Sequence, residues 1–581
     1  MRNNIYFKTL SKIFLLFDKE LKVRSILVTI LVLVNVLIEL IGLTLIFPVI
    51  LIALDFEVLL SNHYISQIIN YIGISSSKNI LLFFLTSILF IFLLKNLLSI
   101  FIQKKQINFG LYVGQKFTYH EFELLTRLNL LNIKKLKSTI AERNIVTIPY
   151  FLVNFIIQPT ILITTEILVL LVILFSLVIY DWKIVTLIFL TVFPPFIFAY
   201  FFSRNKIEYY SRKIIDLTPK VNQWVYQSFF GFVDMKILGK EDYFINNFKS
   251  NFSKKNYYFG WQSLFKNIPV KIVEISIVFM LIIVIIYGFF FVNDKNSFSI
   301  FLTIFSVSLF RIIPLTNRLI QSMLLLKGYQ YVFEIINPLK TKIQNQSSIE
   351  SPSEFTSLSL NSISFNYEKE NIINNLSIEI NRGDFVGIAG ESGSGKTTLI
   401  NIILGFFKPK NGDIFFNGKK MNDIKSLQNI VGYVQQDVYI MDGTIKENIL
   451  FGSENHDEEK LCSICLKVNL LDFVNSLENK FDTKIGELGS LISGGQKQRI
   501  GIARAIYNNR KILILDESTN SLDHKTEEEI FKLLKELNNN GLTLIVIAHN
   551  HKLFKNCNKI IELKDNNNRI ISKNDFFKTL S

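Results

Sequence analysis

The sequence predicts a membrane α-helical domain, with six transmembrane helices and long cytosolic extensions, followed by a soluble α/β domain. Three observations favour this fold class. The chain has 581 residues, which is too long for one compact domain. Its long apolar runs lie almost entirely before residue 335. Beyond that point, short apolar runs alternate with Gly, Asn, Lys and Asp, which is typical of a soluble α/β domain.

We predict six membrane spans because six apolar stretches approach or reach the ~20 residues that cross a bilayer. They lie at residues 25–53, 79–102, 155–180, 184–203, 271–292 and 297–322. Only Asp181, Trp182 and Lys183 join the third span to the fourth. Long basic segments, poor in Gly and Pro, separate the second span from the third and the fourth from the fifth. These segments are interpreted as helices that continue into the cytosol and turn back.

The charge of the chain fits this topology. Lys and Arg give a formal net charge of +15 and crowd the segments expected in the cytosol, as the positive-inside rule requires. Both termini and the α/β domain are therefore expected to be cytosolic. No nucleic acid is expected as a partner, because no groove-reading module accompanies the charge. The predicted boundaries are 1–335 for the membrane domain, 336–356 for a polar linker and 357–581 for the α/β domain.

Charged residues inside the predicted spans are costly in a bilayer and are candidates for function. Arg311 and Arg318 are seven residues apart in FRIIPLTNRL and share one helix face. In one interpretation they hold an anionic phosphate group of a cargo through forked hydrogen bonds. In the other they pair with acidic residues of the spans and hold the helices together; the candidates are Glu39, Glu166 and Glu274.

Two closely spaced pairs have local explanations. Lys271 and Glu274 are i, i+3 neighbours and are expected to form an ion pair. Cys462 and Cys465 form a C-x-x-C pair, but no second pair completes a zinc site, so packing on one buried helix face is expected. The three cysteines of the chain also fit a reducing cytosol better than a disulfide framework.

A glycine-rich loop in the α/β domain carries the strongest signal for phosphate binding. It follows the apolar run DFVGIAG, which is interpreted as a buried strand, and precedes the helical pattern TTLINIILGF. This is a P-loop in its required strand–loop–helix setting, formed by Gly390, Glu391, Ser392, Gly393, Ser394, Gly395, Lys396, Thr397 and Thr398. Lys396 is expected to reach the β- and γ-phosphates of ATP, and the Thr397 hydroxyl to bind Mg²⁺. The second half is thus predicted to be an α/β P-loop ATPase domain with ATP and Mg²⁺ as its cofactors.

A second apolar run, KILILDE, ends in two carboxylates. Asp516, at the end of this predicted strand, is placed to hold the Mg²⁺ shell. Glu517, one residue further, can orient or deprotonate the attacking water. A strand that ends in Asp-Glu is a weak pattern alone, but together with the P-loop it indicates nucleotide hydrolysis.

With these motifs, the last 225 residues resemble the nucleotide-binding domains of ABC transporters, whose motifs occur here in the family's order. The resemblance implies that Tyr367 stacks on adenine and that Gln436 touches Mg²⁺ and senses the membrane domain. It implies that His549 is the switch histidine that contacts the γ-phosphate. Three further segments match family motifs: the signature with Ile492, Ser493, Gly494, Gly495 and Gln496, the D-loop with Ser521, Leu522 and Asp523, and an exporter-specific contact at Thr483–Glu487.

In that family the signature faces the P-loop of a partner subunit, so that ATP lies between two chains. A chain with one P-loop and one signature is therefore expected to form a homodimer. Three positions depart from the usual pattern without removing a catalytic group: Ile492, Gln435 and Asn550. The resemblance implies two active sites per dimer, since the expected catalytic and metal-binding set is complete with Lys396, Asp516, Glu517 and His549.

The membrane half resembles bacterial flippases for polyprenyl-diphosphate-linked oligosaccharides, through NVLIELIGLTLIFPVIL and FRIIPLTNRL. This implies ATP-driven transfer of a glycolipid to the outer leaflet, with Arg311 and Arg318 near the diphosphate. Export of another lipid, a peptide or a drug on the same scaffold stays open. An ATP-gated channel or regulator is the alternative from another class, and the intact Glu517 argues against it. The abundance of Ile, Asn, Lys and Phe suggests an AT-rich bacterial genome, and hence the inner membrane.

Overall fold

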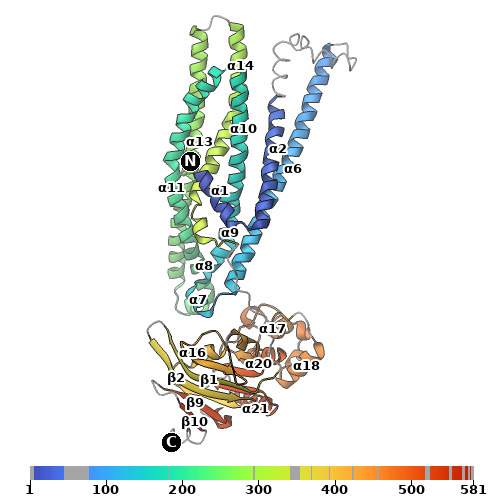
Figure 1. The fold of residues 1–581 in the computed structure, drawn as a ribbon, viewed down its shortest axis with the longest axis vertical. Helices are drawn as coiled ribbons and strands as arrows, with labels where there is room; N and C mark the ends of the chain where they lie inside the picture. Colours follow the sequence, from blue (N-terminus) through green and yellow to red (C-terminus); the bar gives the residue numbers. More distant parts are fainter. Residues whose placement is uncertain are drawn as a thin grey trace. The chain divides into compact units, whose positions relative to one another are not determined.

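The computed structural model describes residues 5–44, 77–180, 182–291, 295–339, 354–367, 370–391, 393–421, 424–453, 457–516, 524–547, 553–564, 569–572 and 576. The chain divides into two compact units, Met1–Gln344 and Asn345–Ser581. The first unit is helical, and the second contains two β-sheets with helices around them (Figure 1).

Among the described residues, six long helices build most of the first unit. They are α2 (Lys19–Thr44), α6 (Ser77–Thr126), α10 (Gln158–Tyr180), α11 (Trp182–Phe230), α13 (Glu241–Phe291) and α14 (Lys295–Gly328). Short elements join or flank them: α1 (Ile5–Leu16), α7 (Leu130–Lys135), α8 (Ser138–Glu142), the π-helical turns η1 (Arg143–Thr147) and η2 (Val153–Ile157), α9 (Ile148–Leu152), α12 (Phe232–Ile237) and α15 (Val332–Ile335). A helix of about 50 residues is ~75 Å long, more than twice the ~30 Å hydrocarbon core of a bilayer. Helices α6, α11 and α13 have 50, 49 and 51 residues, so each is long enough to extend well beyond a bilayer.

Within the described residues, four segments are both long enough and apolar enough to cross a membrane. They are Lys19–Glu39, Leu85–Thr126, Ser138–Phe175 and Glu241–Phe290. The predicted spans 184–203 and 297–322 lie inside α11 and α14, and their crossing of a membrane stays a prediction. The end of the first predicted span, from residue 45 onward, lies outside the described residues.

Helices α11 and α13 run side by side (Figure 1) and are joined by aromatic side chains. Ring pairs link Phe202 to Phe265, Tyr209 to Tyr258, and Trp224 to Tyr243, with centroids 6.0, 6.3 and 5.9 Å apart. We call these six residues the aromatic ladder. The residue number falls on α13 as it rises on α11, as antiparallel pairing requires. Such ring pairs stabilise a contact beyond the area that they bury.

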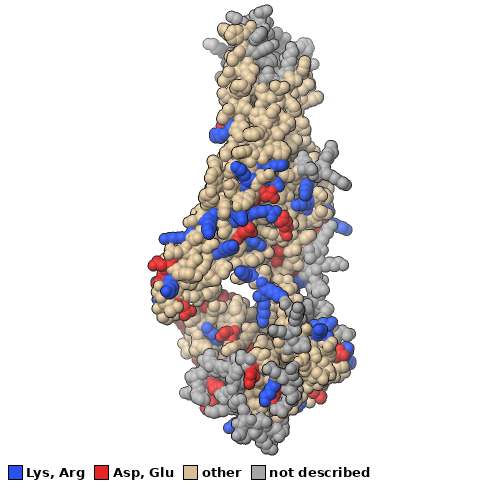
Figure 2. Space-filling model, turned by 90° about the vertical axis from the view of Figure 1, so that its left-hand side faces the viewer, with Lys and Arg blue, Asp and Glu red and all other residues tan. Residues whose placement is uncertain are grey.

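Charge is unevenly distributed along the helical unit. Figure 2 shows a face on which Lys and Arg gather over the lower part of this unit, while mostly uncharged residues cover its upper part. In the sequence, basic residues follow the predicted fourth span along α11 as Arg204, Lys206, Arg212, Lys213 and Lys220. This distribution fits an apolar part in the membrane and a basic extension in the cytosol.

The second unit is built around a six-stranded sheet with the order β10-β9-β3-β8-β7-β6. Its strands are β3 (Phe385–Gly390), β6 (Val431–Val434), β7 (Ile512–Asp516), β8 (Thr543–Ile547), β9 (Lys559–Leu563) and β10 (Arg569–Ser572). All neighbours pair in parallel except β10, which is antiparallel to β9. The apolar runs of β7 and β8 are almost wholly buried, as expected for parallel strands covered on both faces.

A separate antiparallel sheet and several helices complete this unit. The sheet has the order β2-β1-β4-β5, with β1 (Ser357–Tyr367), β2 (Glu370–Asn381), β4 (Asn411–Phe416) and β5 (Lys419–Lys420). The helices are α16 (Lys396–Ile403), α17 (Ile445–Leu450), α18 (Glu458–Lys467), α19 (Leu471–Ser476), α20 (Gly494–Tyr507) and α21 (His524–Asn539). The short 3-10 helices are η3 (Ile424–Asn429), η4 (Lys480–Asp482), η5 (Glu487–Gly489) and η6 (Leu553–Asn556).

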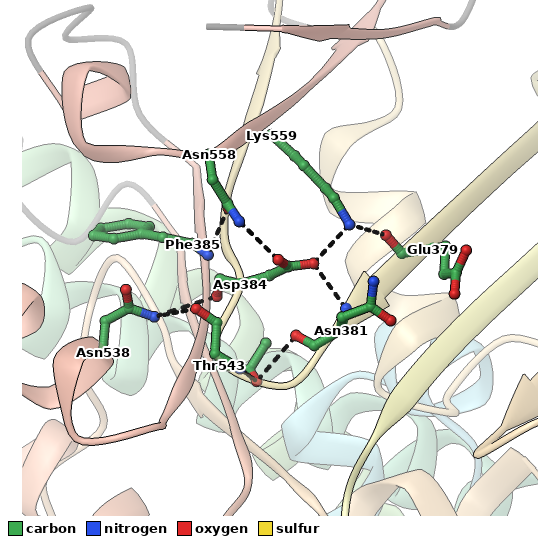
Figure 3. A network of polar contacts seen from close by, with 9 residues as sticks. Glu379, Asn381, Asp384, Phe385, Asn538, Thr543, Asn558 and Lys559 are labelled. Atoms are coloured by element: carbon green, nitrogen blue, oxygen red, sulfur yellow. Dashed lines mark hydrogen bonds and ion pairs between the residues drawn. The ribbon is translucent and has the colours of Figure 1, made fainter.

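A buried polar network fixes the amino-terminal edge of the parallel strands (Figure 3). The carboxylate of Asp384, directly before β3, accepts hydrogen bonds from Lys559 Nζ at 2.8 Å, Asn558 Nδ2 at 2.7 Å and the Asn381 backbone N–H at 2.8 Å. Burial alone would raise the pKa of Asp384, but Lys559 and the hydrogen bonds lower it below its ordinary value. The carboxylate is therefore charged at neutral pH and anchors the start of β3, whose other end leads into the P-loop.

Candidate functional site

The nucleotide motifs meet at the carboxyl ends of adjacent parallel strands. The P-loop follows β3, Asp516 ends β7, and Gln436 follows β6 by two residues. Strand β8 lies between β3 and β7, and its last residue, Ile547, pairs with Asp516 on one side and with Ile388 on the other. Ligands of open parallel sheets bind at this edge. The fold therefore brings together three segments that are distant in the sequence. Gly390 and Asp516, for example, are 126 residues apart.

Glycines shape the P-loop because its backbone needs conformations that other residues avoid. Gly393 and Gly395 have φ angles of +89° and +96°. A Cβ atom on Gly390 would lie 2.7 Å from the Leu563 carbonyl oxygen and 2.5 Å from Ser394 Oγ. Gly395 is also the N-cap of α16, which begins at Lys396. The loop thus delivers the amino end of a helix, with its free N–H groups, to the site.

Lys396 is folded into the P-loop. Its side chain is buried, and Nζ donates hydrogen bonds to the carbonyl oxygens of Gly390 at 2.7 Å and Glu391 at 2.9 Å. The neighbouring Thr397 is exposed, whereas Thr398 is buried. Ser392 lies outside the described residues. The arrangement can present one ammonium group and one hydroxyl to a polyphosphate.

An aromatic group surrounds Tyr367 at the end of β1. The rings of Phe365 and Phe407 are stacked, with centroids 5.2 Å apart. Tyr367 packs edge-on against both, at 5.1 Å from Phe365 and 5.7 Å from Phe407, and stays half-buried. Its ring is therefore held in place and keeps a surface on which a base can stack.

The signature residues form the start of helix α20. Ser493 is the N-cap, and Gly494 and Gly495 open the first turn. Gln496 completes a capping box: its backbone N–H donates to Ser493 Oγ at 3.3 Å, and its Oε1 accepts from the Ser493 N–H at 2.8 Å. A second helix amino end is thus preformed in the single chain.

The structure describes two segments that the family resemblance places near the membrane domain. Gln436 is exposed after β6. In the Thr483–Glu487 segment, Lys484 forms an antiparallel bridge with Thr444, and Ile485 is buried. The backbone of this segment is therefore fixed against the segment that precedes α17.

Four predicted site residues after β7 and β8 lie outside the described residues. They are Glu517, Asp523 and His549, together with Ser521 of the predicted D-loop. Their roles stay predictions. The described strands nevertheless end directly before them: β7 ends at Asp516 and β8 at Ile547.

A polar cavity of about 350 Å³ lies in the helical unit, lined by α2, α6, α10 and α14. Arg318 of α14 lines it and donates from Nε and Nη2 to the two carboxylate oxygens of Glu166 on α10, at 2.5 and 3.2 Å. Glu39 of α2 also lines it and pairs with Lys95 of α6 at 3.0 Å. The structure thus favours the helix-pairing interpretation for Arg318. The side chain of Arg311 lies outside the described residues.

Comparison with known proteins identifies the family. Residues 373–520 match the family described as ABC transporter. A protein from Syntrophus aciditrophicus named ATP-dependent lipid A-core flippase is 37% identical over 238 residues, or 41% of this chain and 39% of that protein. A protein of the same name from Saccharophagus degradans is 30% identical over 407 residues, or 68% of this chain and 67% of its own length. The chain belongs to the ABC transporter family.

A solved structure extends the comparison to the whole fold. The structure of a bacterial Atm1-family ABC exporter with ATP bound aligns over 97% of both chains, with a TM-score of 0.73 and 20% identity. At this identity the likeness concerns the fold alone. The likeness confirms the predicted fold class, and this ABC transporter has the fold of an exporter-type half-transporter. The chain spans about two fifths of the length of the Syntrophus relative.

Two polar residues of this ABC transporter were missed by the sequence analysis. Tyr433 of β6 donates a hydrogen bond to Asp516 Oδ2 at 2.7 Å, and burial together with that carboxylate raises its pKa. Arg504 of α20 donates to the carbonyl oxygens of Asn448 at 2.9 Å and Tyr439 at 3.1 Å. The only sequence signals were a tyrosine inside the apolar strand VGYV and an arginine within the signature helix.

We expect Tyr433→Phe to raise the Mg²⁺ concentration that gives half-maximal ATP hydrolysis by roughly 10-fold, since hydrogen bonds that orient metal ligands have effects of this size. This concentration is measured by following ATP hydrolysis at saturating ATP while Mg²⁺ is titrated. Tyr439→Phe is the matched control, because Tyr439 lies in the loop after the same strand and its side chain is exposed. An unchanged Mg²⁺ dependence of Tyr433→Phe would contradict the orienting role.

The cysteine pair of the nucleotide-binding domain corrects one expectation. Cys465 is buried in α18, and this burial raises its pKa to about 12. Cys462, one helical turn earlier, is exposed. The expected burial of both cysteines on one face is therefore wrong for Cys462. Among the described residues, no group of His, Cys, Asp and Glu is placed to hold a metal ion.

Proposed function

We propose that this ABC transporter hydrolyses ATP as a homodimer to move an amphipathic cargo across the bacterial inner membrane. The observation that carries the proposal is the meeting of Lys396 and Asp516 at one edge of a parallel sheet, in a chain with an exporter-type helical unit. Phosphate-binding and metal-binding groups at one sheet edge suit phosphoryl transfer.

ATP is proposed to bind with its phosphates at the amino end of α16. Lys396 Nζ would exchange its two carbonyl partners for phosphate oxygens, and the Tyr367 ring would stack on adenine. Three residues would fit Mg²⁺ because they offer oxygen ligands: the exposed Thr397 and Gln436, and the half-buried Asp516, to which Tyr433 donates a hydrogen bond. When bound, Mg²⁺ would neutralise the negative charge that develops on the phosphates during hydrolysis.

Hydrolysis is proposed to use residues that follow β7 and β8. Glu517 would orient or deprotonate the attacking water, and His549 would contact the γ-phosphate. In a homodimer, the α20 start of each chain would face the P-loop of the other, with Ser493, Gly494 and Gly495 at the phosphates and Asp523 between the two sites. The preformed capping box supports this role, since it presents a finished helix end to a partner.

The proposed cargo is a polyprenyl-diphosphate-linked oligosaccharide. Two findings support a lipid with a polar head: relatives that are named lipid A-core flippases, and a polar cavity among apolar helices. Arg318 already donates from Nε and Nη2 to Glu166, so this carboxylate balances its charge. We therefore assign Arg318 to helix pairing, and among the two arginines only Arg311 remains a proposed ligand of the diphosphate.

The test is ATP-dependent flipping of a polyprenyl-diphosphate oligosaccharide in proteoliposomes, with Glu517→Gln as the paired variant. Flipping by the parent and none by the variant would support both the pump and the cargo class. Hydrolysis without flipping would keep the ATPase and discard this cargo in favour of another lipid, a peptide or a drug. Equal flipping by parent and variant with ATP would instead favour an ATP-gated channel.

A further inference from the structure

Uncharged polar side chains form much of the wall of the polar cavity. Its polar wall includes Asn35 of α2, Ser99, Gln103 and Gln106 of α6, and Gln158 and Thr165 of α10. Ser99 Oγ donates to Asn35 Oδ1 at 3.0 Å. The volume of about 350 Å³ lies in the range of small-molecule sites. All the helices that line the cavity belong to one unit of one chain.

The described charged side chains of the cavity balance one another. Among the described residues, its charged side chains are Glu39, Glu166 and Arg318, and the described Lys95 pairs with Glu39. Two cations and two carboxylates give a net charge of zero. Among these described side chains, both cations already pair with a carboxylate, so none of them is left to balance an anionic group such as a diphosphate. The charge balance therefore favours an uncharged polar ligand.

The amide groups offer many hydrogen bonds to such a ligand. Each glutamine has two N–H donors and a carbonyl acceptor. The Nε2 atom of Gln106 is buried and has no hydrogen-bond partner among the described residues. Ser99, Gln103 and Gln106 have the i, i+4, i+7 spacing that lines one face of α6 over ~10 Å. The buried Gln106 Nε2 and the neighbouring Gln103 amide can therefore form hydrogen bonds with hydroxyl groups of a ligand.

We propose that this cavity binds the carbohydrate part of the cargo through the amides of Gln103, Gln106 and Gln158. This rests on the proposed function and names the part of the lipid that the cavity recognises. A hydroxyl both donates and accepts, so a sugar satisfies donors and acceptors in one ring without changing the charge balance. The ligand chemistry is a hydroxyl-rich ring, and its source is either a lipid-linked or a free sugar.

Binding of three radiolabelled probes to the full-length protein in lipid nanodiscs tests the proposal. The probes are a short prenyl diphosphate that carries a disaccharide, the same prenyl diphosphate without sugar, and the free disaccharide. We expect Gln103→Leu/Gln106→Leu to weaken binding of the glycosylated lipid at least ~10-fold, the effect of about 1.4 kcal/mol in lost hydrogen bonds. Binding of the sugar-free lipid should change less than ~2-fold.

Two further variants guard against indirect effects. Gln115→Leu removes a glutamine of the same helix that is outside the cavity and donates to Tyr119 Oη at 2.7 Å, and it should bind all probes like the parent. Gln158→Leu changes the facing helix α10 and should repeat the selective loss if the double variant fails to fold.

Unchanged binding of the glycosylated lipid, or equal losses for both lipids, would overturn the proposal. A parent that binds both lipids equally would overturn it as well. Selective loss for the glycosylated lipid supports a lipid-linked sugar, and the same loss for the free disaccharide identifies soluble sugar as a source. Sugar-selective binding in a protein that fails the flipping assay would leave this inference standing while the proposed transport falls.

Discussion

Lys396→Ala is expected to lower ATP hydrolysis at least ~100-fold, the scale on which single charged donors act on a transferring phosphoryl group. The ammonium group is buried and held by two loop carbonyls, so it stands beside the phosphates before they arrive. No neighbouring described cation is similarly placed inside the loop. Phosphate release by the purified protein, measured over a range of ATP concentrations, gives the effect on both turnover and affinity.

Lys408→Ala is the matched control for this variant. Lys408 follows α16 in the sequence and is exposed. The Lys408→Ala variant should therefore hydrolyse ATP at the parental rate. Thermal unfolding of both variants separates a lost phosphate contact from a lost fold. A stable Lys396→Ala protein with more than a tenth of the parental rate would show that this lysine does not serve the phosphates.

The second large effect is expected at the Arg318–Glu166 pair in the membrane half. Arg318→Met should destabilise the helical unit, because it leaves the buried Glu166 without a countercharge. Glu166→Gln should destabilise it less, because the Arg318 side chain is 49% exposed. The double variant should recover part of the loss. A double-mutant cycle of unfolding in increasing dodecyl sulfate should give a coupling of about 1–2 kcal/mol.

The Lys271–Glu274 pair provides a control of the same chemistry. It was expected from the i, i+3 spacing, and the structure confirms it at 2.9 Å, but Lys271 is 72% exposed. Its coupling should be below about 1 kcal/mol. Additive effects of Glu166→Gln and Arg318→Met would show that their contact does not hold the helices together.

Local motifs in the sequence predicted where much of the candidate nucleotide site lies in the fold. The P-loop glycines, Lys396 and Asp516 are adjacent to strands, and the rule that parallel strands gather their carboxyl ends at one edge placed them together. The Tyr433–Asp516 hydrogen bond could not be predicted, because it depends on β6 lying next to β7, a matter of strand order. Motif spacing along the chain carries no such information.

In the membrane half, the sequence left Arg318 with three possible acidic partners. Glu166 is the partner because α10 packs against α14. This packing could not be predicted, because the apolar spans have similar compositions and do not indicate which helices are neighbours. The same holds for Cys462: an i, i+3 spacing sets two residues near one another on a helix, but neighbouring elements decide which of them is covered. Surfaces created by packing were thus less predictable than motifs.

The aromatic ladder has a mechanical consequence. Helices α11 and α13, with 49 and 51 residues, are ~74 and ~77 Å long. The ring pairs couple residues 202–224 of α11 to residues 243–265 of α13, so we expect the two helices to move together as one rod. Tilting such a rod by about 10° displaces its far end by about 13 Å. A small rotation at one end is thereby amplified into a shift wider than a helix at the other, with Pro194, Pro195, Pro219 and Pro269 as the places where the rod can bend.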